Sequence, residues 1–276
     1  MTEFAAARSD QPGAPEEALI SLDGDLAGGL LILCDHATRK MPAEYADLGL
    51  PEEELQRHIA YDIGVGPLAE ELAERLGAPA ILTQFSRLLI DPNRGEDDPT
   101  LIMRISDGTL VPGNRGVDAG ERERRLERFY RPYHRRITAT IEAMIAAGRP
   151  PAIFSIHSFT PDWKGMRRPW HAGVLWDKDP RLAQPLLELL REEHGLRVGD
   201  NEPYTGALSG DTLNKHGTAR GLAHALIEVR NDLIAHPPGI AEWAERLEAI
   251  LRQVLQDEAL YKTRQYGSHA DDVVKG

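Results

Sequence analysis

Two histidines stand directly after short apolar runs of the sequence. His36 follows GLLILC and one aspartate, and His157 follows AIFSI. Histidines at the carboxyl edge of a sheet can share a metal ion, and a catalytic zinc site uses three nitrogen or oxygen ligands with one position left for water. Asp62 and Glu228 are the leading candidates for a third, carboxylate ligand. The alternative is that each histidine is an ordinary hydrogen-bonded loop residue, since the sequence has no compact HExxH pair.

Both carboxylates also have a structural interpretation. Asp62 stands just before a run of helical period, where aspartate is a favoured N-cap. Glu228 lies at the end of AHALIEV, a run apolar enough to be a buried strand, where a carboxylate is costly unless it is paired or functional. Residues two apart on a strand share a face, so a salt bridge to Arg230 is the alternative to a general-base role for Glu228.

A dense polar cluster occurs in SRLLIDPNR, residues 86–94. Arginine forks bind carboxylates in a bidentate manner, so Arg87, Arg94 or Arg230 could hold the carboxylate of an amino-acid substrate. The alternative is an ion-pair network with Asp91 at the edge of the sheet. The spacing alone leaves both interpretations open.

A sheet must bring these segments together. Short apolar runs alternate with segments of helical period, which is typical of an α/β domain with a largely parallel sheet covered by helices. In open α/β sheets, ligands bind at the carboxyl ends of the strands. The pattern predicts strands at 29–34, 80–85, 88–90, 152–156, 172–176 and 223–229, and helices at 63–76, about 120–147 and about 240–260.

Bulk composition limits the possible functions. The 276 residues, 41% of them hydrophobic, predict one large domain at 19–261 with flexible tails at 1–18 and 262–276. A net charge of −12 argues against nucleic acid or an anionic membrane as partner, so an anionic ligand must meet a local basic pocket. The single cysteine, Cys34, excludes an internal disulfide, and with no signal peptide or membrane-length apolar stretch it favours the cytoplasm.

Seven motifs occur along the chain in the order CDHA, HIAYDIG, SRLLIDPNR, PYH, SIHSF, DNEPYTG and IEVRNDLI. Together they resemble the N-formylglutamate amidohydrolase family, over about residues 31–255. That family is related to zinc exopeptidases and to zinc-dependent N-acetylmuramoyl-L-alanine amidases. The resemblance implies a single three-layer α/β domain of the zinc-exopeptidase kind, with a mixed, largely parallel sheet flanked by helices.

The resemblance also implies roles for individual residues. By similarity, His36, Asp62 and His157 hold zinc or another divalent transition metal, and Glu228 is the general acid/base. Asp62 is a departure, because the cell-wall amidases carry the longer glutamate there. The substrate-contacting residues that the resemblance implies are Arg87, Asp91, Asn93, Arg94, Arg230, Asn201 and Tyr204.

The function predicted from these features is hydrolysis of the amide of a small, anionic N-formyl or N-acyl amino acid, with water activated by the metal and Glu228 moving the proton. A cell-wall amidase or metallo-carboxypeptidase is the competing enzyme, and the missing signal peptide argues against it. A non-catalytic protein that binds a small carboxylate through its arginines is the alternative from another class. No motif specifies the acyl group, the amino acid, the native metal or the oligomeric state.

Overall fold

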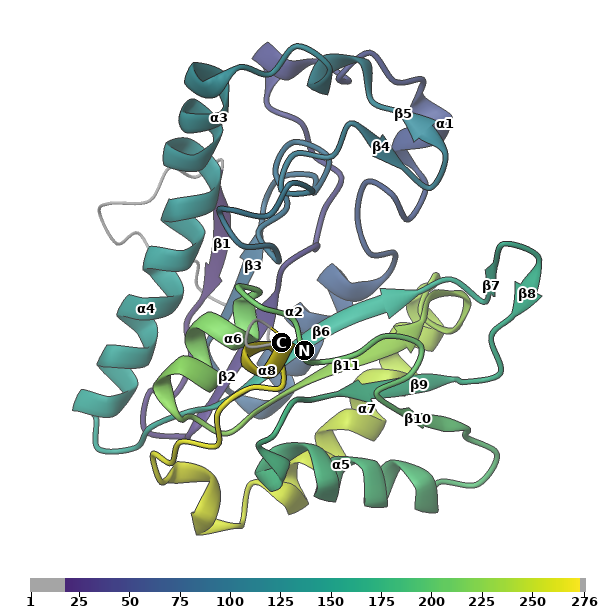
Figure 1. Ribbon diagram of the computed structural model, residues 1–276. Helices are drawn as coiled ribbons and strands as arrows, with labels where there is room; N and C mark the ends of the chain where they lie inside the picture. Colours follow the sequence, from purple (N-terminus) through teal and green to yellow (C-terminus); the bar gives the residue numbers. More distant parts are fainter. Residues whose placement is uncertain (1–17, 274–276) are drawn as a thin grey trace, which may run out of the picture.

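The computed structural model describes residues 18–273, and a seven-stranded mixed sheet forms its centre (Figure 1). The strand order is β1-β3-β2-β6-β11-β9-β10. Strands β3, β2, β6 and β11 run parallel, β1 and β9 are antiparallel to their inner neighbours, and β10 is parallel to β9. The bounds are β1 Leu19–Leu22, β2 Leu30–Cys34, β3 Ala80–Thr83, β6 Ala152–Phe159, β9 Ala172–Leu175, β10 Val198–Asp200 and β11 His224–Arg230.

Helices cover both faces of the sheet, because the strands are apolar on both sides. On β2, Ile32 and Cys34 pack with the helices of one face, whereas Leu31 and Leu33 pack with those of the other. The first face is covered by α2 (Val65–Leu76), α5 (Pro180–Glu192) and α7 (Pro237–Val254), and the second by α4 (Arg131–Ala146) and α6 (Thr212–His216). The predicted three-layer α/β domain is confirmed (Figure 1).

A separate apolar cluster forms a cap, residues 41–61 and 85–130, above the carboxyl edge of the parallel strands. Besides short 3₁₀ turns, the cap contains α1 (Glu52–Leu55), β4 (Ile105–Ser106), β5 (Thr109–Leu110) and α3 (Ala119–Arg125). The strand predicted at 88–90 is wrong, since this run is a buried turn inside the cap. Side chains satisfy its backbone instead of a neighbouring strand: Asn114 Nδ2 donates to Leu88 O at 2.8 Å, and Arg125 Nη1 donates to Leu89 O at 2.8 Å.

The helix predicted at about 120–147 is interrupted by a π-helical turn, Leu126–Tyr130, between α3 and α4. Pro132 follows that turn, and proline has no N–H to continue the regular α-helical ladder. The helix predicted at 63–76 is α2, whereas the helix predicted at about 240–260 ends early, because α7 stops at Val254 and a separate 3₁₀ turn, Glu258–Tyr261, follows. The predictions did not include β1, β10, α5 or α6, nor the small hairpin of β7 (Asp162–Trp163) and β8 (Met166–Arg167).

The chain ends differ from the predicted tails. Apart from Ala18, the predicted N-terminal tail lies outside the described residues. The flexible tail predicted from residue 262 is corrected as far as residue 273, because this segment packs on the domain and ends in α8 (Ala270–Val273). Arg264 N donates to Gly221 O at 2.8 Å, and His269 Nδ1 lies 2.6 Å from Asp177 Oδ1.

Cys34 closes β2 and is fully buried on the α2 face of the sheet. Burial raises the pKa of its thiol well above the ordinary value.

Within residues 18–273, no helix combines the length and the apolar character that crossing a bilayer requires.

Candidate functional site

His36, Asp62 and His157 come together at the carboxyl edge of the parallel strands. His36 follows β2, His157 lies near the end of the neighbouring strand β6, and Asp62 precedes α2. Nδ1 of His36 lies 3.3 Å from Asp62 Oδ2, and Nδ1 of His157 lies 2.9 Å from the same oxygen. All three side chains are buried, and their potential ligand atoms lie within 4.8 Å of one another. The group could therefore hold a metal ion.

The other ring nitrogen of each histidine contacts a second carboxylate. Nε2 of His36 lies 2.8 Å from Asp91 Oδ1, and Nε2 of His157 lies 3.0 Å from Asp35 Oδ2. Asp35 is itself fixed, because Thr212 Oγ1 donates to it at 2.6 Å. Metal-binding histidines characteristically donate their other ring N–H to such a carboxylate, which fixes the tautomer and the ring orientation. The two rings therefore present Nδ1 toward a common point beside Asp62.

The electrostatics of the group favour a cation. Burial opposes ionisation of Asp35, but the hydrogen bond and charge of His157 lower the pKa of Asp35 to about 2. The pKa of Asp62 is also lowered by both histidines, and that of Asp91 by Arg87, although burial opposes both shifts. Arg87 donates to Asp62 at 3.3 Å and to Asp91 at 2.7 Å. Arg87 thus pairs with two of these buried carboxylates and His157 with the third, Asp35, and a divalent cation would add positive charge to this acidic group.

Asp62 does not cap the helix that follows it. The N-cap of α2 is Gly64, with no side-chain cap bond, whereas Asp62 Oδ2 accepts from Ser158 N at 3.3 Å. Gly64 has φ 86°, and a Cβ there would lie 2.1 Å from Ile234 O. Glycine is therefore required at this close approach, which turns the chain from the carboxylate into α2. The geometry does not support the N-cap interpretation.

Glu228 lies beside His157 and has an unsatisfied oxygen. The two residues are paired in register on the parallel strands β11 and β6. Glu228 is 7% exposed, and its Oε2 has no hydrogen-bond partner among residues 18–273. Burial raises the pKa of Glu228 to about 8, assisted by the charge of Asp62 and opposed by that of His157. Arg230 does not pair with Glu228, because its Nε donates to Asp232 Oδ1 at 2.7 Å.

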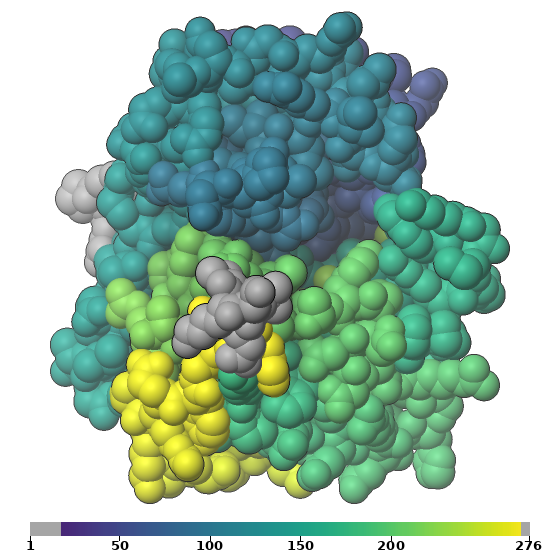
Figure 2. Space-filling model, viewed as in Figure 1, coloured from purple at the N-terminus to yellow at the C-terminus, as the bar shows by residue number. Residues whose placement is uncertain are grey.

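A pocket of about 490 Å³ opens onto these residues. His36, Asp62, His157 and Glu228 all line it. Figure 2 shows the hollow on this face between the cap, blue, and the loops of the sheet below it, green. Four of the residues predicted to contact substrate also line the pocket, namely Arg87, Asn93, Arg94 and Tyr204.

The other three predicted substrate residues do not line the pocket. Asp91 is fully buried behind His36 and carries the ion pair to Arg87. Asn201 shapes a loop, since its Oδ1 accepts from the backbone N of Trp176 at 3.1 Å and of Gly206 at 2.9 Å. Arg230 donates to Asp232 and to the backbone. In the structure these three side chains contact other parts of the protein, so their predicted contact with substrate stays a prediction.

Sequence reasoning assigned no site role to three polar residues around the pocket. Asp35 was adjacent to His36 in the CDHA motif, so its position carried a signal. Asp211 lines the pocket as the N-cap of α6, and burial raises its pKa to about 7. Arg168 donates to Tyr204 Oη at 3.0 Å and lies 5.4 Å from the ring centroid of Trp163. No sequence pattern singled out Arg168, whose contacts come from three separate segments.

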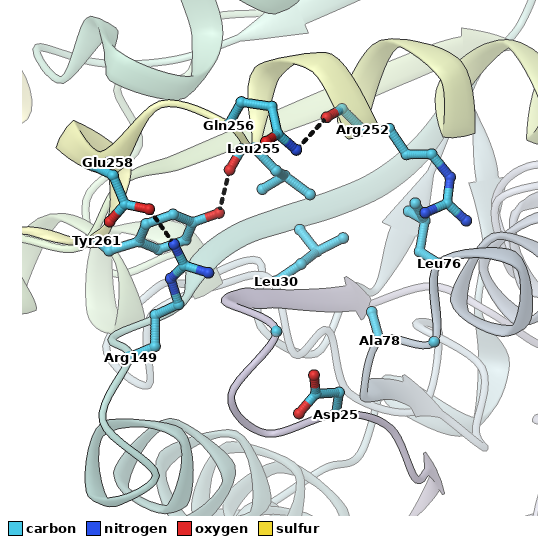
Figure 3. Close-up of a pocket in the computed structure, with 12 residues that line it drawn as sticks. Asp25, Leu30, Leu76, Ala78, Arg149, Arg252, Leu255, Gln256, Glu258 and Tyr261 are labelled. Atoms are coloured by element: carbon cyan, nitrogen blue, oxygen red, sulfur yellow. Dashed lines mark hydrogen bonds and ion pairs between the residues drawn. The ribbon is translucent and has the colours of Figure 1, made fainter.

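A second cavity, of about 330 Å³, lies at the opposite edge of the sheet, where β2 begins (Figure 3). Its charged groups have protein partners. Arg149 forms an ion pair with Glu258 and stacks 3.8 Å from the ring centroid of Tyr261, and Arg252 Nη2 donates to Arg75 O at 2.7 Å. No histidine lines this cavity. The first pocket is therefore the candidate active site.

The fold and the site together define a class of three-layer α/β proteins with a potential metal centre at the carboxyl edge of a mixed sheet. The chain belongs to the N-formylglutamate amidohydrolase family, whose model matches residues 28–235. It is 32% identical over 145 residues to an N-formylglutamate deformylase of Pseudomonas aeruginosa, a match that covers 47% of this chain and 51% of that protein. A second N-formylglutamate deformylase, from Pseudomonas putida, is 33% identical over 120 residues, or 38% of this chain and 42% of that protein. The chain thus spans about half the length of the curated relatives, or less.

Two solved structures are also similar. A gene product of Agrobacterium tumefaciens has a TM-score of 0.81 and 35% identity, with 87% of this chain and 95% of that chain covered. The N-formylglutamate amidohydrolase from Ralstonia eutropha has a TM-score of 0.68 and 23% identity, with 87% and 97% covered. At that identity the second likeness shows the fold alone. The predicted family is confirmed.

Proposed function

We propose that this protein is a metal-dependent amidohydrolase that cleaves the amide of a small N-acyl amino acid. The observation that carries the proposal is the unpaired carboxylate of Glu228 beside His36, Asp62 and His157 in one pocket. The deformylase names of the curated relatives support an amide bond as the target. A cytoplasmic location stays a prediction, which cell fractionation would test.

The donor set fits a catalytic zinc ion. Two imidazole nitrogens and one carboxylate oxygen make a three-ligand site, and the side facing the pocket leaves room for water and substrate. Zinc held there would supply Lewis-acid chemistry that acidifies water and polarises an amide carbonyl. Asp35 and Asp91 hold the two imidazole rings in register for this ion.

Glu228 is placed to move the proton. Its carboxylate accepts a proton from the attacking water and delivers it to the leaving nitrogen, so that the C–N bond breaks to give a carboxylic acid and an amine. A raised pKa suits this role, because the group then holds and releases a proton near neutral pH. Burial excludes the bulk water that would compete for the proton.

Arg94 is the side chain that we assign to the substrate carboxylate. It lines the pocket and donates only to the neighbouring Asn93 O, at 3.1 Å, among the contacts of the described residues. Arg87 also lines the pocket, but its two terminal nitrogens are engaged by Asp62 and Asp91. A carboxylate in the pocket would therefore find its open guanidinium at Arg94.

Replacing Arg94 by methionine is expected to lower kcat/KM by about 10- to 100-fold for a substrate with a free carboxylate, since hydrogen bonds to charged groups contribute about 1.5–3 kcal/mol. The loss should be much smaller for the same substrate with its carboxylate amidated. Arg104→Met is the matched control, because Arg104 is exposed and does not line the pocket. Equal losses of Arg94→Met on both substrates would show that Arg94 supports the fold and does not bind the anion.

Replacing Asp91 by asparagine separates its two possible roles. An orienting carboxylate behind His36 predicts metal affinity weakened by about 10- to 100-fold, because second carboxylates of this kind typically contribute that much. A substrate contact predicts a higher KM with metal affinity unchanged. Titration of the variant with a competing chelator measures the affinity, and an unaltered value would contradict the orienting role.

The experiment that tests the proposed function is metal analysis of the purified protein, joined to a screen of N-formyl, N-acetyl and longer N-acyl amino acids for amine release. We expect about one divalent ion per chain and turnover of at least one substrate. A protein that binds these compounds but releases no amine with metal bound would support the non-catalytic alternative.

A further inference from the structure

The pocket continues from Glu228 along the sheet as an apolar arm, which we define by Leu175, Leu208, Leu213 and Leu226. Leu226 lies two residues before Glu228 on β11, on the same face, and is paired in register with Leu175 on β9. Leu213 comes from α6, and Leu208 comes from the loop that crosses the pocket; all four line it. Along β11, the pocket lining thus changes from charged at Glu228 to aliphatic at Leu226.

The polar residues around the apolar arm offer no cation. His224, on the same strand face, has both ring nitrogens engaged, with Nδ1 2.8 Å from Leu222 O and Nε2 3.1 Å from Thr218 Oγ1. Asp211 is acidic and accepts from Asn214 N at 2.7 Å. A second anionic group on the substrate would find no partner in this part of the pocket.

Among the described residues that line the pocket, Arg94 is the one guanidinium that no carboxylate pairs with. The arginines among its described lining residues are Arg87 and Arg94, and no lysine is among them. Arg87 bridges Asp62 and Asp91 through both terminal nitrogens, with only its Nε unpaired, which leaves the terminal nitrogens of Arg94 for an anion. The charges therefore fit a substrate with one free carboxylate better than one with two.

The pocket is also larger than a formylated amino acid requires. Its volume of about 490 Å³ lies within the roughly 300–1,000 Å³ typical of sites for drug-sized ligands. The apolar arm is part of this volume, and its aliphatic walls favour apolar groups, whose transfer out of water is favourable.

We infer that the substrates are N-acyl amino acids with one free carboxylate and one apolar group of several carbons, and not dicarboxylates such as N-formylglutamate. This inference rests on the proposed function and names its substrate class. Either the acyl chain or the amino-acid side chain supplies the apolar group, because both would make the same aliphatic contacts with the apolar arm. Water adds its oxygen to the acyl carbon and a proton to the leaving nitrogen, which gives a carboxylic acid and an amino acid.

The test compares kcat/KM of the metal-loaded enzyme for N-formyl-L-glutamate, N-formyl-L-alanine, N-formyl-L-leucine and N-hexanoyl-L-alanine. Each buried methylene contributes about fourfold, so at least one apolar substrate should exceed N-formyl-L-alanine and N-formyl-L-glutamate by about tenfold or more. Preference for the leucine compound assigns the apolar arm to the side chain, and preference for the hexanoyl compound assigns it to the acyl chain. N-formyl-L-glutamate as the best of the four would overturn the inference.

A binding experiment keeps the inference separate from the proposed activity. N-hexyl-L-alanine and N-methyl-L-glutamate contain no amide, so calorimetry can compare their binding to the metal-free protein without turnover. Tighter binding of the hexyl compound by about tenfold or more is expected. Equal binding, or preference for the glutamate compound, would overturn the substrate class. Failure of all four amides to react, with the hexyl compound bound, would count against the proposed function alone.

A charge placed in the apolar arm should reverse the selectivity. Leu208 is 38% exposed, so Leu208→Arg should fold, and it adds a guanidinium where the second carboxylate of a dicarboxylate would lie. We expect the ratio of kcat/KM for N-formyl-L-glutamate over the preferred apolar substrate to rise by about tenfold or more. Leu26, 39% exposed and outside this pocket, gives the matched control Leu26→Arg, which should leave the ratio unchanged. An unchanged ratio in Leu208→Arg would overturn the inference.

Discussion

Glu228→Gln is expected to lower kcat by about 10²–10⁴-fold, the range that a general acid/base contributes. The amide keeps the shape of the side chain but cannot accept the proton of the attacking water. Metal content and the thermal unfolding midpoint should stay close to those of the wild type, because Glu228 is neither among the three grouped ligands nor paired with Arg230. Steady-state kinetics, metal analysis and circular dichroism on the same preparation measure the three quantities.

The matched control for this variant is Glu202→Gln. Glu202 is an exposed glutamate on the loop after β10 and does not line the pocket, so its loss of charge should leave turnover unchanged. Wild-type kcat/KM in Glu228→Gln, with its metal retained, would mean that another group moves the proton.

His157→Ala is expected to lose the bound metal and to lower kcat/KM by at least about 10³-fold. Lewis-acid stabilisation contributes several kcal/mol, and each 1.36 kcal/mol is a factor of ten in rate. Chelation of the wild-type protein should produce a similar loss, and added zinc should restore the chelated wild type but not the variant. His236→Ala is the control, since His236 is exposed and remote in sequence from the three grouped residues.

Two further measurements test whether His157→Ala loses its metal because a ligand is missing. Circular dichroism checks the fold of His157→Ala, because the substitution leaves Asp35 without its imidazole partner and Asp62 with that of His36 alone. His36→Ala tests the second ring independently. Full metal occupancy in both folded variants would show that the ligand set is wrong.

The centre of the sheet could be predicted from the sequence, whereas its edges could not. β2, β6 and β11 are buried on both faces, so their near-continuous apolar runs stand out. β1 and β10 are edge strands of four and three residues, too short to show a period. The run at 88–90 was misassigned because a buried turn and a short buried strand share the same apolar composition.

The sequence pointed to the three residues that lie together in the candidate site, but not to the residues that contact them from behind. His36, Asp62 and His157 stand next to strand ends or a helix start, and the topology brings such positions together. The partner of Asp91 depends on how the cap folds over the sheet, which spacing does not encode. The ion-pair interpretation of SRLLIDPNR is confirmed for Arg87, whereas binding of a substrate carboxylate by Arg94, which lines the pocket, stays a prediction.

Cys34, the one thiol in the sequence, is buried in the core with a raised pKa. Thiolate is the reactive form, so maleimides and other alkylating reagents should leave the folded protein unmodified. A cysteine introduced at an exposed position would then be labelled selectively in the otherwise native chain. Tyr204, 43% exposed on the loop that crosses the pocket, is such a position. A spin label or fluorophore attached there would report the motion of this loop as ligand enters and leaves.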